Sequence, residues 1–172
     1  MSAPAAAPVI VSALFGAADQ AWFDRQRRAH FPPERNHLPA HLTLFHHLPP
    51  GLAAEVSQRL RDETRGAPAP VARVAGLMSL GRGVAYRIES DDLSAIRARL
   101  AEAFAGMLLP QDAAAGWRAH VTVQNKVEPA EARALLATLQ AGFQPRPVAI
   151  AGLAAYWYRG GPWEPLSRHM FG

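Results

Sequence analysis

The sequence contains no cysteine and only one lysine, Lys126, among its 18 basic residues. The absence of cysteine excludes disulfide frameworks, thiolate nucleophiles and zinc sites with cysteine ligands. No apolar run is long enough to cross a membrane, and residues 1–8 lack the basic residues that begin a signal peptide. We therefore expect a cytoplasmic protein that does not associate with membranes.

The composition is that of an ordinary globular protein with a basic bias. The chain has 172 residues, of which 49% are hydrophobic and 19% are charged, and its formal net charge is +4. This length suits one domain with a sizeable core. Arginine presents a planar fork that matches phosphate, so the charge balance favours an anionic ligand. A GC-rich genome also produces arginine-rich chains, and the charge alone does not decide between the two explanations.

Two short stretches repeat the pattern His-x-Thr-x, with apolar residues at the x positions: His41-Leu42-Thr43-Leu44 and His120-Val121-Thr122-Val123. In an extended strand alternate side chains face the same way, so each histidine shares a face with its threonine. The leucines and valines then face a core. Two imidazoles on matching strands can act as a general acid and a general base near neutral pH.

The surrounding elements place both motifs in equivalent positions of two similar halves. Each half is predicted to run strand, helix, motif strand, helix, hairpin strand. The predicted strands besides the motifs are 9–15, 71–80, 84–89, 148–158 and 163–170, and the predicted helices are 16–30, 52–65, 91–107 (capped by Asp91 or Asp92) and 128–140. We expect an α+β fold in one domain, 1–172, made of two interlocked lobes, roughly 1–83 and 84–172. A pseudo-two-fold axis would relate the lobes, with two antiparallel sheets facing a central cleft and helices outside.

The alternation predicts a polar stripe on each motif strand. The stripes contain His41, Thr43, Phe45 and His47 on the first strand, and Arg118, His120, Thr122, Gln124 and Lys126 on the second. These groups suit a phosphate: the two histidines as the catalytic acid and base, and the two threonines, Arg118 and Lys126 as phosphate-binding groups. His46 and His47 are adjacent and face opposite sides, so we expect no metal site there.

Aromatic residues on the predicted strands include Phe45, Tyr86, Trp157 and Tyr158. Most strand aromatics are core residues, and one or two of these at the cleft could stack on a nucleobase. Trp163, which follows Gly160-Gly161-Pro162, is expected to pack within its hairpin.

The duplicated motif, together with the element order from about residue 9 to residue 169, resembles the two-histidine (2H) phosphoesterase superfamily, and within it the bacterial 2′–5′ RNA ligase and cyclic phosphodiesterase branch. The resemblance implies a bilobal α+β fold and metal-independent chemistry, with no cofactor, on 2′,3′-cyclic phosphates or 2′–5′ linkages. It implies that His41 and His120 form the acid/base pair and that Thr43 and Thr122 hold the phosphate. Which histidine is the acid stays open.

The expected partners are RNA ends or nucleotide cyclic phosphates, and the expected oligomeric state is a monomer. Two alternatives stand beside this interpretation. One is a binder of RNA or nucleotides that does not catalyse a reaction, and the other is a phosphodiesterase for a cyclic phosphate unrelated to RNA. A metal-dependent hydrolase is the least favoured interpretation.

Overall fold

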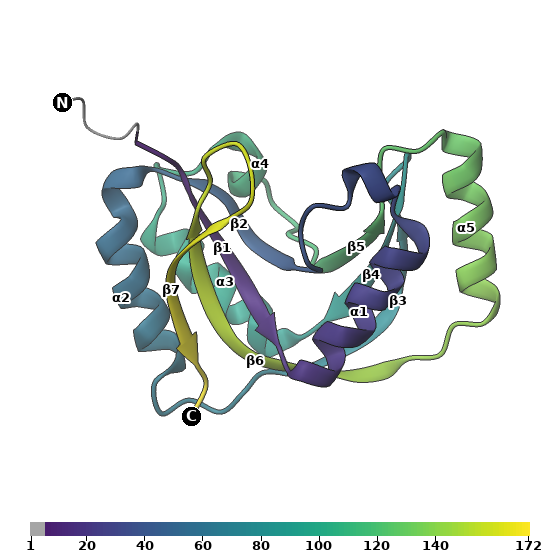
Figure 1. Ribbon diagram of the computed structural model, residues 1–172. Coiled ribbons are helices and arrows are strands. Elements are labelled where there is room, and N and C mark those ends of the chain that lie inside the picture. Colours follow the sequence, from purple (N-terminus) through teal and green to yellow (C-terminus); the bar gives the residue numbers. More distant parts are fainter. Residues whose placement is uncertain (1–5) are drawn as a thin grey trace.

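The computed structural model describes residues 6–172 and has the α+β architecture expected from the sequence, with helices packed around an antiparallel sheet (Figure 1). The strands are β1 (Val9–Phe15), β2 (Leu42–Leu48), β3 (Val71–Ser79), β4 (Val84–Glu89), β5 (His120–Gln124), β6 (Arg146–Trp157) and β7 (Glu164–Met170). The helices are α1 (Ala17–His30), α2 (Ala53–Thr64), α3 (Asp91–Ala103), α4 (Pro110–Ala113) and α5 (Pro129–Ala141), and short 3-10 turns occupy Pro33–Arg35 and Pro50–Leu52.

Strand β6 lies at the centre of the sheet and pairs directly with β1, β3 and β7. The order along the sheet is β2-β1-β6-β3-β4-β5, with β7 also paired to β6, and every pairing is antiparallel. The first residues of β6, 146–149, pair with β3, whereas residues 150–157 pair with β1. The two sheets expected from the sequence are therefore joined through one long strand that belongs to both.

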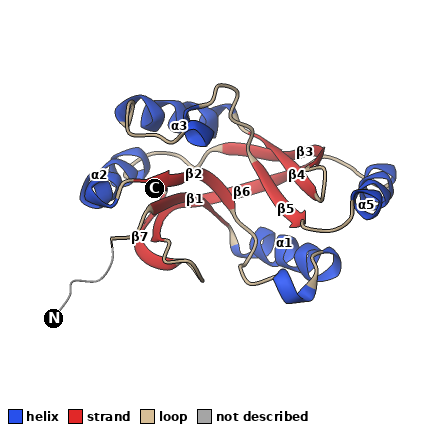
Figure 2. Ribbon diagram, turned by 90° about the horizontal axis from the view of Figure 1, so that it is seen from above, coloured by secondary structure: helices blue, strands red, loops and turns tan. Residues whose placement is uncertain are grey.

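The strands that carry the two motifs, β2 and β5, lie at opposite ends of this sheet order and yet contact each other. The sheet must therefore curve so that β2 and β5 come together, and the view from above shows its two halves at an angle to each other (Figure 2). Helix α1 packs on β5, α5 on β3 and β4, and α2 on β6 and β7. The curvature brings the strands of His41 and His120 together, although these residues are 79 positions apart in the sequence.

The apolar residues of the two motifs form part of the core, as the alternation predicted. Leu42, Leu44, Val121 and Val123 are each 0% exposed. Burying a side chain of this size contributes about 1.5–3 kcal/mol. These residues fix the orientation of both strands, so that the histidines and threonines between them are turned away from the core.

Alternation fails two residues after each threonine, at Phe45 and Gln124, where the pairing of both strands is irregular. Thr43 lies opposite Ser12 and Phe45 opposite Val11, so two steps along β2 match one step along β1. Thr122 and Gln124 show the same mismatch against β4. A bulge reverses which face the following side chains occupy. The prediction that Phe45 and Gln124 belong to the polar stripes is therefore wrong, and both are buried.

Helix α3 begins one residue earlier than the predicted cap. Ser90 is the N-cap, and its Oγ accepts a hydrogen bond from the backbone N–H of Leu93 at 3.1 Å. Asp91 and Asp92 lie in the first helical turn instead, where their negative charges still face the positive end of the helix dipole. A serine cap of this kind contributes about 1 kcal/mol. The helix ends at Ala103, before the predicted residue 107.

Candidate functional site

The two motif histidines are held in the same way. The Nδ1 atom of His41 lies 2.8 Å from the carbonyl oxygen of Pro39, and Nδ1 of His120 lies 2.8 Å from the carbonyl oxygen of Arg118. A carbonyl only accepts hydrogen bonds, so Nδ1 carries the proton in each ring. In the neutral ring, Nε2 then keeps a free lone pair and can accept a proton.

Helix α1 fixes the position of both motif strands. Gln20 donates from Nε2 to the carbonyl oxygen of Ala40 at 2.9 Å, and the backbone N–H of Ala40 donates to Asp24 Oδ1 at 2.8 Å. Arg27 donates from Nη1 to the carbonyl oxygen of Thr122 at 3.0 Å. Residues 20, 24 and 27 lie on one face of a helix. A single rigid element therefore holds the residue before His41 and the strand of His120.

Arg27 is a buried cation that sequence reasoning missed. It is 4% exposed, it donates from Nε to Asn36 Oδ1 at 3.1 Å, and its guanidinium lies 4.3 Å from the ring centre of Phe31. Burial lowers the pKa of Arg27, and the nearby Asp24 carboxylate opposes this effect. The signal in the sequence was an arginine four residues after Phe23, on the apolar face of the helix.

The surroundings of His41 keep its ring neutral. Desolvation is the main cause that lowers its pKa to about 4, and the Pro39 carbonyl partly opposes it. Electrostatic interactions with Arg27, His120 and His46 lower this pKa further. At pH 7 the His41 ring is therefore neutral, with Nε2 free to accept a proton.

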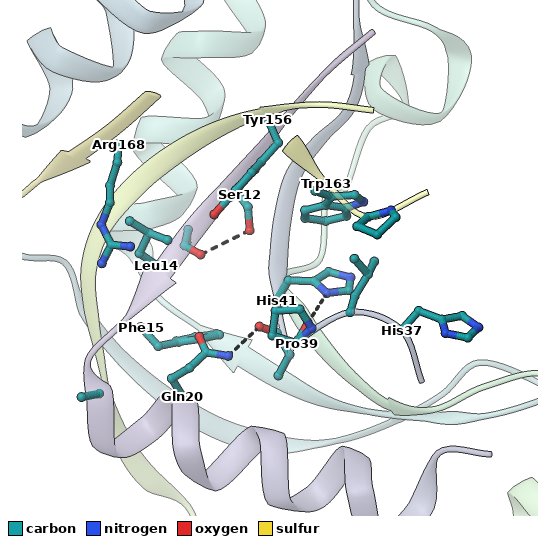
Figure 3. Close-up of a pocket in the computed structure, with 15 residues that line it drawn as sticks. Ser12, Leu14, Phe15, Gln20, His37, Pro39, His41, Tyr156, Trp163 and Arg168 are labelled. Carbon is teal, nitrogen blue, oxygen red and sulfur yellow. Dashed lines mark hydrogen bonds between the residues drawn. The ribbon is translucent and has the colours of Figure 1, made fainter. Parts of the chain in front are cut away.

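Two cavities meet at His41. The larger has a volume of about 690 Å³ and is rich in cations, with Arg27, Arg35 and Lys126 in its wall beside Thr122. The smaller has a volume of about 500 Å³ and is largely aromatic and apolar. Its interior is shown in Figure 3. The residues common to both walls are His37, Leu38, His41 and Pro162.

The predicted phosphate-binding residues differ in their positions. Thr122 and Lys126 line the larger cavity. Thr43 is half-buried on β2, and the side chain of Arg118 is exposed; neither belongs to the wall of this cavity. Within residues 6–172 neither threonine hydroxyl has a hydrogen-bond partner, so both are available to a ligand.

Lys126 has an unusual backbone conformation. Its φ is 62°, in the left-handed region that residues other than glycine rarely adopt. The backbone N–H of Lys126 donates to Asn125 Oδ1 at 2.8 Å, which stabilises this turn directly after β5. Strained residues of this kind gather at functional sites. The turn places Lys126 in the wall of the larger cavity.

His46 is paired with a carboxylate that no local sequence pattern predicts. Nδ1 of His46 lies 3.0 Å from Oδ1 of Asp112, which is 2% exposed. Burial raises the pKa of Asp112, but hydrogen bonds from the His46 ring and from the backbone N–H groups of His46 and His47 outweigh it and hold the pKa below its usual range. In the part of the chain that the structure describes, no group of three or more histidine, cysteine or acidic residues could hold a metal ion.

The aromatic residues of the predicted strands lie mostly in or against the core, as expected, with one at a cavity. Phe45 and Tyr86 are core residues, and Trp157 packs against the core. Tyr158 lines the larger cavity. Trp163 does more than pack within its hairpin, because its ring centre lies 4.6 Å from that of His41.

Comparison with known proteins yields a family and a fold. The sequence family described as the 2′-5′ RNA ligase superfamily matches residues 15–162 of this chain. Escherichia coli LigT complexed with NADP+ is 17% identical, with a TM-score of 0.60 over 96% of this chain and 98% of that chain. TT0787 of Thermus thermophilus is 14% identical, with a TM-score of 0.64 over 95% and 97%. A structure described as a phosphoesterase is 18% identical, with a TM-score of 0.58 over 96% and 98%.

Other structures of Escherichia coli LigT hold 3′-AMP or ATP. No curated protein sequence matches the chain. At these identities the structural likeness establishes the fold alone. Among residues 6–172, no helix is both long and apolar enough to span a membrane.

Proposed function

The chain belongs to the 2′-5′ RNA ligase superfamily, and on that premise we propose that it is a metal-independent phosphoesterase for 2′,3′-cyclic phosphates or 2′–5′ linkages of RNA or nucleotides. The observation that carries the proposal is the matched anchoring of His41 and His120. Each ring donates a hydrogen bond from Nδ1–H to a carbonyl oxygen, which leaves Nε2 for a substrate. This is the equipment for paired proton transfer at one phosphorus atom.

In this proposal His41 is the general base and His120 is the general acid. Water, or a ribose hydroxyl in the ligation direction, attacks phosphorus while Nε2 of His41 removes its proton. The bond from phosphorus to the leaving ribose oxygen breaks, and that oxygen receives a proton from Nε2 of His120. The lowered pKa of His41 supports the assignment, because a ring that stays neutral can accept a proton but holds none to donate. Each transfer contributes about 10²–10⁴-fold to the rate.

The remaining predicted groups would hold the phosphate. The hydroxyls of Thr43 and Thr122 have no partner within the described chain and can donate to non-bridging oxygens. Lys126 and Arg27 in the wall of the larger cavity supply positive charge. Arg118, which is exposed beside His120, is proposed to contact the more distant part of an RNA strand.

A nucleotide-sized substrate suits the dimensions of the site. The larger cavity has a volume of about 690 Å³, within the usual range of small-molecule sites. LigT is seen with NADP+, 3′-AMP and ATP, and we propose that this chain also takes nucleotides. Hydrolysis is the proposed direction, because water is abundant whereas ligation needs two RNA ends placed together on a small protein.

Turnover of a nucleoside 2′,3′-cyclic phosphate in excess chelator tests the proposal. We expect full activity without added metal, and identification of the 2′- or 3′-phosphate product gives the regiochemistry. Activity that disappears in chelator and returns with a divalent metal would contradict the metal-independent mechanism. Tight nucleotide binding without any turnover would favour the alternative of a binder that does not catalyse a reaction.

The pH profile of kcat/KM should have an unusually low acidic limb. The pKa of His41 is lowered to about 4, so above that pH the ring is neutral and can act as a base. When the pH falls through that value, the ring becomes protonated and can no longer accept a proton. Because kcat/KM reports the ionisations of the free enzyme, we expect the acidic midpoint near pH 4. Initial rates measured from about pH 3.5 to about pH 8 at low substrate concentration give this midpoint. A midpoint near 6.5, the value of an ordinary histidine, would contradict the assignment of His41 as the base.

A further inference from the structure

The smaller cavity lies on the other side of His41 from Lys126, and its walls are suited to a flat ring. Trp163 lies against His41, and the ring centres of Tyr156 and Trp163 are 5.5 Å apart. Figure 3 shows these two residues above the cavity, with Phe15 and Pro39 on the opposite side. The volume of about 500 Å³ is ample for a nucleobase. An aromatic ring that enters this cavity gains stacking area on side chains that are already arranged.

Two polar side chains of this cavity, those of Ser12 and Gln20, already donate hydrogen bonds to backbone carbonyl oxygens. Ser12 donates from Oγ to the carbonyl oxygen of Leu42 at 2.9 Å, and Gln20 donates to the carbonyl oxygen of Ala40. Arg168 differs from them, because in residues 6–172 its guanidinium has no hydrogen bond or ion pair. Arg168 faces the cavity from β7, at the side away from Trp163 (Figure 3). The His37 and Tyr156 side chains in this wall also lack a hydrogen-bond partner among the described residues, but only Arg168 offers a charged, planar donor, which matches the acceptor atoms at a base edge.

We propose that the smaller cavity is the nucleobase subsite of the phosphoesterase. The base stacks on the wall formed by Tyr156 and Trp163, and Arg168 donates hydrogen bonds to acceptors at the base edge. The sugar passes His41, and the phosphate reaches the cationic cavity that contains Lys126. This inference rests on the proposed function for the position of the phosphate, and it extends that function by selecting nucleosides over cyclic phosphates without a base.

The charge distribution supports placing the base in the smaller cavity and the phosphate in the larger one. The cations Arg27, Arg35 and Lys126 all line the larger cavity, whereas the aromatic pair and one arginine line the smaller one. A ligand with an anionic end and an aromatic end matches both cavities at once. A cyclic phosphate of a sugar or of glycerol would fill the cationic cavity alone and leave the aromatic wall in water.

Binding measured by titration calorimetry tests the subsite without any need for turnover. The probes are guanosine 2′-monophosphate and ribose 2-phosphate, which differ only in the base. Because stacking of a base on an aromatic side chain amounts to roughly a five- to hundredfold change in affinity, we expect the wild type to prefer the nucleotide by at least about tenfold. Trp163→Ala should reduce this preference to about one- to threefold, and Trp163→Phe should keep most of it.

Arg168→Ala provides a second, independent variant, because Arg168 is exposed and does not contact His41. It should reduce the preference for guanosine 2′-monophosphate by roughly five- to tenfold, the effect of losing hydrogen bonds from a charged donor. Arg133→Ala is the matched control, since it removes the same charge from the exposed surface of α5, outside both cavities, and should leave the preference unchanged.

Equal affinity of the wild type for the two probes would overturn the subsite, and so would a preference that survives both Trp163→Ala and Arg168→Ala. The proposed function fails separately. If the base preference depends on these residues but no cyclic phosphate is hydrolysed, the subsite stands and the phosphoesterase proposal falls. If cyclic phosphates with and without a base are hydrolysed equally well, the phosphoesterase stands and the subsite falls.

Discussion

Replacing His41 or His120 by alanine is expected to lower kcat/KM for a nucleoside 2′,3′-cyclic phosphate by about 10²–10⁴-fold in each case. His41→Ala removes the ring whose free Nε2 would take the proton of the attacking water. His120→Ala removes the ring that would give a proton to the leaving ribose oxygen. Steady-state rates in excess chelator measure both losses under conditions in which metal ions cannot substitute for the missing group.

The double variant distinguishes cooperation from two independent effects. Groups that act as a unit in one step show strongly non-additive losses, so the double variant should be only slightly slower than the slower single variant. His30→Ala is the matched control, because His30 lies at the end of α1 and lines neither cavity. Turnover that survives either His41→Ala or His120→Ala in a folded protein would refute the acid/base assignment.

Asp112→Ala is expected to lower the free energy of unfolding by about 2–4 kcal/mol. The Asp112 carboxylate accepts hydrogen bonds from the backbone N–H groups of His46 and His47 at 2.9–3.0 Å and from the His46 ring at 3.0 Å. Alanine would leave the two backbone N–H groups without this partner. Urea denaturation followed by circular dichroism gives the free energy of unfolding. Asp62→Ala, which removes an exposed carboxylate from α2, should change it by less than about 0.5 kcal/mol.

The stabilising effect of Asp112 should depend on pH. Its pKa in the folded protein lies below the ordinary value of 3.8, so the charged form is stabilised by folding. The contribution is fully present well above that ordinary value and is lost as pH falls through the lower pKa of the folded state. The difference in stability between wild type and Asp112→Ala should therefore narrow below about pH 4. A difference that is the same at about pH 3 and at about pH 7 would contradict an ionic role for Asp112.

Much of the fold and part of the candidate site could be predicted from local patterns. Leu42 and Leu44 alternate with His41 and Thr43, and this alternation was enough to predict a strand with one buried face. Beyond Leu44 the same rule failed, because a bulge depends on how two strands pair and leaves no period in the sequence.

Contacts between distant residues account for most of what was missed. Arg27 reaches Thr122, and His46 reaches Asp112, across 95 and 66 residues of chain. No spacing rule connects residues so far apart. Trp163 was misjudged for the same reason, because its partner His41 lies just before β2, far away in the sequence. Local patterns therefore indicated the chemical groups of the site, while the residues that hold them became visible only in the structure.

The shared strand β6 has a consequence for how the chain is synthesised. The pairs β1–β2 and β3–β4–β5 use segments that leave the ribosome early, but β1 and β3 each leave one edge open for residues 146–157. Open edges of apolar strands recruit other chains and promote aggregation. A product truncated before residue 146 would expose two such edges at once, so both halves of the sheet depend on synthesis of β6 to cover them.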